Sequence, residues 1–108
     1  MTQVPLPKPR IPLPTPEEYT PEQRKIYEDV VKGPRGVLRG PLRAVIHRAE
    51  LANLWQQFGE LLRYRTSLPP RLSELAILVT ARYSDAPFEW HAHEPPAIAG
   101  GVPREAID

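Results

Sequence analysis

The chain has no cysteine among its 108 residues. This absence excludes disulfides, thiolate metal sites and every reaction that depends on a thiol. The chain also lacks an apolar run long enough to span a membrane, and its first residues lead into prolines rather than into the apolar core of a signal peptide. We therefore expect a soluble, cytoplasmic protein.

The chain also has no large excess of positive or negative charge. Fourteen Lys and Arg face thirteen Asp and Glu, which gives a net charge of +1, and the two signs are interspersed along the chain. Binding to nucleic acid requires basic residues clustered on one face. We expect neither a nucleic acid nor a membrane as a partner.

Proline, in contrast, is abundant. Of the 15 prolines, many lie in the segment VPLPKPRIPLPTP at residues 4–16. Such a run cannot form a helix and favours extended polyproline II. Because apolar residues alternate with these prolines, we expect residues 1–17 to form an arm that lies along a protein surface, such as that of a neighbouring subunit.

The remaining residues, 18–108, carry helical patterns separated by turn signals. Thr20 is a good N-cap for a helix that begins at Pro21 and ends at Gly33. No pair of strands is predicted, so we expect an all-α domain. The further helices are predicted at residues 42–47, 50–64, 71–83 and 87–100.

Two of these helices are unusually apolar. Helix 71–83 is apolar on almost all sides, and such a helix is normally buried. Helix 50–64 carries large apolar residues at spacings of three and four, which define one face. A chain of this length has few other helices to cover both surfaces, so we expect a homo-oligomer. The apolar residues of helix 50–64 are Leu51, Leu54, Trp55, Phe58, Leu61 and Leu62.

The stretch FEWHAHEPPAIAGG, residues 88–101, concentrates acidic and imidazole side chains. In a strand, His91 and His93 would share one face and could chelate a metal ion together. In a helix they point about 200° apart and cannot converge on one ion. Because the segment is predicted to be helical, we expect no metal site.

Acid–base chemistry suits the segment better. Glu89 and His93 are four residues apart and share a helical face. Glu74 is the only charged residue between Arg71 and Arg82, on a helix that is otherwise apolar. A buried carboxylate must be paired. Glu74 therefore either forms a structural ion pair, for example with Arg71, or orients His93 for proton transfer.

Three segments, GPLRAVIHRAELANLW, RYRTSLPPRLSELAILVTAR and FEWHAHEPPAIAGGVP, together resemble the carboxymuconolactone decarboxylase-like proteins of the AhpD-like superfamily. The resemblance extends from about Gly36 to the C-terminus. It implies an AhpD-like helical bundle that forms trimers or hexamers. Members of the family are longer, so the chain looks truncated at its C-terminus.

The peroxidase branch of this superfamily carries the motif E-x11-C-x-H-C-x3-H. Glu74 and His93 match its two ends with the spacing intact. Ala86, Phe88 and Glu89 stand in place of the first cysteine, the middle histidine and the second cysteine. A thiol peroxidase without a thiol has no nucleophile, so we expect no such activity.

The decarboxylase-like branch commonly carries YEWxxH, which FEWHAH matches with Phe88 in place of tyrosine. This resemblance implies decarboxylation, or lactone processing, of a small carboxylic acid without a metal or organic cofactor. In that chemistry His93 would protonate the enolate-like carbanion, Glu74 would orient His93, and Glu89 would be a second proton carrier.

The rest of a substrate site is less defined by the sequence. Arg82 or Arg43 would hold a substrate carboxylate, and His47 is a further candidate, although a lone histidine after an apolar stretch is more often structural. Three aromatic side chains are expected to line an apolar pocket: Trp90, Trp55 and Phe58.

Two hypotheses of another kind remain beside the enzyme. In the first, the protein is a non-catalytic helical oligomer, and its buried Glu and His residues form structural ion pairs. In the second, it is a binding protein whose proline-rich arm is recognised by an SH3-like partner.

Overall fold

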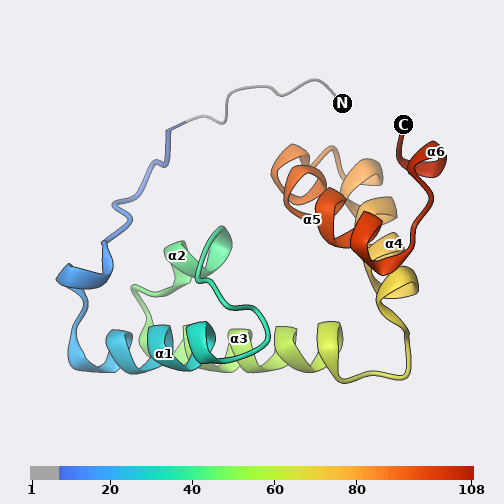
Figure 1. The fold of residues 1–108 in the computed structure, drawn as a ribbon. Coiled ribbons are helices and arrows are strands. Elements are labelled where there is room, and N and C mark those ends of the chain that lie inside the picture. Colours follow the sequence, from blue (N-terminus) through green and yellow to red (C-terminus); the bar gives the residue numbers. More distant parts are fainter. Residues whose placement is uncertain (1–7) are drawn as a thin grey trace. The chain divides into compact units, whose positions relative to one another are not determined.

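The structure is a computed structural model that describes residues 8–108, and every regular element in this part is a helix (Figure 1). The all-α prediction is thus confirmed. The described residues divide into two compact units, 8–65 and 66–108. None of the helices within 8–108 is long and apolar enough to cross a membrane. The elements are the 3-10 helix η1 (Pro16–Glu18) and the helices α1 (Pro21–Lys32), α2 (Pro41–Val45), α3 (Ala49–Tyr64), α4 (Pro70–Tyr83), α5 (Pro87–Gly100) and α6 (Arg104–Ile107).

In the unit of residues 8–65, α1 begins as the sequence predicts. The Thr20 hydroxyl accepts a hydrogen bond from the Gln23 backbone N–H at 3.2 Å, and the Gln23 side chain accepts one from the Thr20 N–H at 3.0 Å. This reciprocal cap satisfies two N–H groups that the helix itself cannot. The Gln23 amide also donates to the carbonyl of Ile46 at 3.0 Å, which ties α1 to the residue that follows α2.

The described part of the proline-rich arm is bound to this same unit. Arg24 donates from Nη2 to the Pro16 carbonyl at 2.6 Å, and His47 Nε2 forms a hydrogen bond with the Pro12 carbonyl. A carbonyl only accepts, so Nε2 carries the proton. Residues 1–7 of the predicted arm lie outside the described residues, and its contact with a neighbouring subunit stays a prediction.

Helix α3 turns its small and polar face inward. Ala52 and Gln56 are buried, at 1% and 5% exposure, whereas the six large apolar residues of the predicted stripe are 42–62% exposed. The core of this unit is instead built mainly by α1, α2 and the segment between them. It contains Ile26, Val30, Leu38, Leu42, Ile46 and Ala52.

In the unit of residues 66–108, α4 and α5 are joined by a short turn and pack against each other (Figure 1). The prediction that helix 71–83 is buried on most sides is wrong within this chain. Its inward face contains Leu78 and Ala81, but Val79 is 60% and Tyr83 is 92% exposed. One neighbouring helix covers one face only, and the apolar residues elsewhere on α4 stay at the surface.

The C-terminal segment completes this unit. Helix α5 continues through Pro95 and Pro96 and ends at Gly101, whose φ of 106° is a conformation that favours glycine. The turn directs the next residues back toward the α4–α5 pair, so that the short helix α6 does not stand alone. The resulting core contains Leu78, Ala97, Val102 and Ile107.

Candidate active site

Glu74 on α4 and His93 on α5 meet in the interior of the 66–108 unit. Glu74 Oε2 lies 2.7 Å from His93 Nδ1, and their side chains are only 6% and 13% exposed. The predicted approach of these two residues is confirmed. An ionised carboxylate can only accept, so with Glu74 ionised the proton of this hydrogen bond resides on Nδ1 and the second ring nitrogen, Nε2, is left for other chemistry.

The position of Glu74 follows from the face of α4 that packs on α5. Leu78, four residues later, and Ala81, three further, are buried on the same face. The Glu74 carboxylate is therefore removed from water together with Leu78 and Ala81. Such a charge is stable in the interior only when a polar partner compensates for its lost hydration, and His93 is such a partner.

The other ring nitrogen of His93 faces Glu89, one turn earlier on α5. His93 Nε2 lies 3.6 Å from Glu89 Oε2, and the Glu89 side chain is 40% exposed. The imidazole therefore lies between a buried carboxylate and one that reaches solvent. From interior to surface, the order of the three side chains is Glu74, His93, Glu89.

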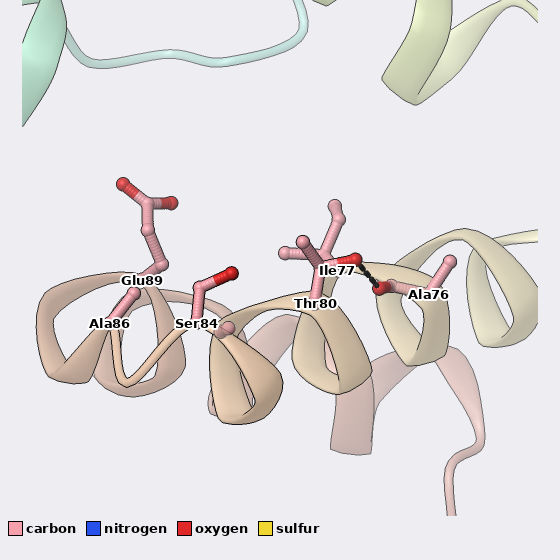
Figure 2. A pocket seen from close by; sticks show the side chains of 7 residues that line it. Ala76, Ile77, Thr80, Ser84, Ala86 and Glu89 are labelled. Carbon is pink, nitrogen blue, oxygen red and sulfur yellow. Dashed lines mark hydrogen bonds between the residues drawn. The ribbon is translucent and has the colours of Figure 1, made fainter.

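Glu89 also lines a pocket of about 460 Å³ on the α4–α5 pair. Figure 2 shows its carboxylate and the side chains of Ile77, Thr80 and Ser84 extending to the same side of the two helices. Glu89 is the one ionisable group among the residues that line this pocket in the described chain, and His93 is not among them. The lining residues are Ala76, Ile77, Thr80, Ala81, Ser84, Ala86 and Glu89.

The hydroxyl residues of this pocket were not predicted from the sequence. Thr80 Oγ1 donates to the Ala76 carbonyl at 2.8 Å, and a hydroxyl that donates one hydrogen bond can still accept another. Ser84 follows at the C-cap of α4. The signal was present in the sequence, because Ile77, Thr80 and Ser84 are spaced by three and four residues and must share a helical face.

A second pocket, of about 320 Å³, contains two of the predicted substrate-binding residues, Trp90 and Arg82. Arg82 lies 3.9 Å from Asp85 in an exposed ion pair, and the buried Nε1 of Trp90 has no hydrogen-bond partner within the described chain. This pocket shares Ala81 and Ala86 with the first one. Its full lining is Ala81, Arg82, Asp85, Ala86, Pro87 and Trp90.

The other predicted binding residues belong to the 8–65 unit and line neither of these pockets. His47 holds the Pro12 carbonyl, which agrees with a structural role for this histidine. Trp55 and Phe58 lie on the exposed face of α3, at 44% and 61% exposure. Arg43 lies on α2. Their roles in substrate binding stay predictions.

Residues 8–108 contain no group of three or more His, Asp or Glu side chains arranged to hold a metal ion. His91 is exposed and points away from His93, as two residues of separation on a helix require. His93 thus has two carboxylates as neighbours, those of Glu74 and Glu89.

Residues 49–108 match the protein-family model described as the carboxymuconolactone decarboxylase family. The chain belongs to this family. The matched region contains Glu74, Glu89 and His93 and both pockets. No curated protein and no solved structure matches the chain significantly. The 108 residues of the chain contain no cysteine.

Proposed function

We propose that this protein is a cofactor-free enzyme that processes a small lactone or decarboxylates a small carboxylic acid by proton transfer. The observation that carries the proposal is the 2.7 Å contact between Glu74 and His93, extended by Glu89 at the wall of a pocket. An imidazole oriented by one carboxylate and facing another is a common arrangement for moving protons near neutral pH.

In the proposed mechanism Glu89 is the catalytic residue, because it is the ionisable group that lines the pocket. His93 and Glu74 are positioning residues. The Nε2 of His93 faces Glu89 at 3.6 Å, and Glu74 fixes the orientation and tautomer of His93 through Nδ1. From the sequence alone His93 was expected to deliver the proton itself, and the lining of the pocket favours Glu89 in that place.

Both candidate reactions balance with these residues. In decarboxylation, the bond to the carboxyl carbon breaks, its electron pair stays on the substrate as an enolate, and the proton of Glu89 goes to that carbon as carbon dioxide leaves. In lactone opening, the Glu89 carboxylate accepts a proton from the attacking water, and the same proton then reaches the ring oxygen as its bond to the carbonyl carbon breaks.

The charge of the residues that line the pocket favours a lactone over a carboxylic acid as the substrate. Its described lining contains Glu89 and no cation, and the remaining residues are apolar or carry a neutral hydroxyl. An anionic substrate group would approach Glu89 without a counter-charge, which is unfavourable in an apolar setting. We therefore propose a substrate with at most one carboxylate. Arg82, in the neighbouring pocket, is a candidate to bind that group.

A non-catalytic protein in which the buried Glu74–His93 pair is purely structural is the competing hypothesis. The low exposure of both side chains favours it, because a buried pair is also what a stable core requires. The two hypotheses differ in Glu89. A structural role does not need a half-exposed carboxylate at a pocket, whereas the enzyme does.

The test is a screen of small lactones and β-keto acids for ring opening and for release of carbon dioxide. With a substrate found, Glu89→Gln should lower kcat on the order of 10²–10⁴-fold, the usual contribution of a positioned proton-transfer group. His91→Gln is the matched control, since His91 lies exposed on the same helix, and its activity should equal that of the wild type. Equal activities for wild type and Glu89→Gln would contradict the assignment.

A further inference from the structure

Within the 66–108 unit, the C-terminal end of α5 approaches the first turn of α4 very closely. A Cβ built on Gly100, the last residue of α5, would lie 3.1 Å from the backbone carbonyl carbon of Pro70. It would also lie 3.2 Å from the backbone nitrogen of Arg71 and 3.2 Å from the Cβ of Pro70. Non-bonded carbon atoms in optimal contact are about 3.5–4.0 Å apart. Any side chain at position 100 therefore requires α4 or α5 to move.

This approach belongs to the same helix–helix contact as the Glu74–His93 pair. His93, Ala97 and Gly100 are spaced by four and three residues, so they share one face of α5. Ala97, in the middle of this face, is 0% exposed. On α4, Pro70 and Glu74 are four residues apart and share the face that packs on α5. A change of the helix separation at Gly100 is therefore transmitted along the face that contains His93.

The atoms that an added Cβ would meet cannot yield without moving the helix itself. They belong to the backbone and to the proline ring of the first turn of α4, and not to the end of a flexible side chain. The rings of Pro69 and Pro70 also fix the φ angles of this turn. An added methyl group must therefore shift α5 from α4 by a few tenths of an ångström.

A shift of this size matters at the hydrogen bond between Glu74 and His93. The 2.7 Å separation of Oε2 and Nδ1 is at the short end of the range of about 2.7–3.2 Å for such bonds. Both side chains are almost fully buried, so water does not readily replace a weakened bond. We propose that Gly100 is a positioning residue, whose lack of a side chain sets the separation of α4 and α5 at which Glu74 binds His93.

Nuclear magnetic resonance of the full chain tests the proposal without a substrate. The proton on His93 Nδ1 should resonate downfield of the backbone amide protons, because its acceptor is a buried carboxylate, and His93→Gln should remove this signal. Gly100→Ala should move the signal upfield and speed its exchange with water. Gly100→Val should do so more strongly. Alanine is a better helix former than glycine, so the Gly100→Ala change does not weaken α5 itself.

Ala99→Ser is the matched control for Gly100→Ala. It also adds one heavy atom to the last turn of α5, but at an exposed position, and the His93 signal should stay unchanged. An unmoved signal in Gly100→Ala, an equal shift in Ala99→Ser, or a wild type without the signal overturns the proposal. A Gly100→Ala variant that does not fold also overturns it, because glycine would then be required for the whole unit and not for this separation.

The consequence for catalysis rests on the proposed function. A misplacement of about 1 Å can lower a rate on the order of 10²-fold, so Gly100→Ala should lower kcat about tenfold. KM should stay unchanged, since Gly100 lines neither pocket. A shifted signal in a protein that processes no lactone or β-keto acid would contradict the proposed function and leave the role of Gly100 standing. A lower kcat with an unmoved signal would contradict the role of Gly100 alone.

Discussion

The two units of the chain depart from the usual distribution of polar and apolar residues in opposite ways. In the 66–108 unit, a carboxylate lies inside: Glu74 is 5% exposed and hydrogen-bonded to His93. In the 8–65 unit, large apolar side chains lie outside, with Leu54 and Phe58 above 60% exposure. Each departure costs stability within the isolated chain, the first through desolvation and the second through hydration of apolar surface.

The difference between the two units indicates that they have different functions. A buried charge with a matched partner beside a pocket suits chemistry, since such groups can be held in an unusual protonation state. An exposed apolar face with a heptad spacing suits association, because its cost disappears when a partner covers it. We assign the proposed reaction to the 66–108 unit.

The largest effect on stability is expected from Glu74. Glu74→Ala leaves the His93 Nδ1–H in the interior without this acceptor, so the free energy of unfolding should fall by about 1–3 kcal/mol. Glu74→Gln keeps an acceptor and should cost less. Urea denaturation measures both. Asp29→Ala is the control from the 8–65 unit, because its exposed pair with Lys25 at 3.1 Å should contribute only ~0.5 kcal/mol or less. Equal losses for Glu74→Ala and Asp29→Ala would remove the contrast between the units.

The next effect concerns the turn that ends α5. Gly101 has φ of 106°, and its turn positions the Val102 N–H on the Ala97 carbonyl at 2.9 Å. Gly101→Ala should lower the free energy of unfolding by about 1–2 kcal/mol, because an L-residue is strained there. Gly36 in the other unit has φ of 71° with nothing within 4 Å of an added Cβ.

Gly36→Ala should therefore cost less than Gly101→Ala, since its backbone conformation is closer to the left-handed region that other residues reach. Thermal denaturation of the two variants ranks them. A larger loss of stability for Gly36→Ala than for Gly101→Ala would contradict the expected greater strain at Gly101.

A smaller effect is expected at the start of α1. Thr20→Ala removes the hydroxyl that accepts from the Gln23 N–H, and the free energy of unfolding should fall by about 1 kcal/mol. Thr66 is the matched control, because its hydroxyl accepts a longer, exposed bond of 3.4 Å from the Leu68 N–H. Thr66→Ala should change stability little in the same denaturation experiment. A loss as large as that of Thr20→Ala would contradict this expectation.

The smallest effect depends on pH and concerns Glu18, where the arm joins the helical domain. Hydrogen bonds from the Thr15 backbone N–H and hydroxyl lower the pKa of Glu18 below its ordinary value of 4.5. A carboxylate whose pKa is lower in the folded state contributes stability above its unfolded pKa and loses it as pH falls through the folded value. Glu18→Gln should thus flatten the loss of stability below about pH 4.5, as measured by denaturation at several pH values. An unchanged profile would show that this contact does not persist in solution.

The local sequence determined most of the secondary structure. Thr20 and Gln23 fix the start of α1, Pro70 fits the first turn of α4, and Gly101 ends α5, because capping and turn preferences depend on residues a few positions apart. The approach of Glu74 to His93 was also accessible. It followed from a lone charge on an apolar helix and from the motif that the chain shares with its family.

Only the tertiary structure decided which faces are buried. The spacing of the apolar stripe on α3 identifies one face of the helix, and the structure shows that the helix packs through Ala52 and Gln56 and leaves Phe58 outside. In the same way, only the packing of α4 on α5 places Glu89, Thr80 and Ser84 around one pocket. Periodicity states that a helix has an apolar side, but it does not state what that side contacts. Burial depends on which elements approach from elsewhere in the chain or from another chain, and that is a property of the packing and not of any one segment.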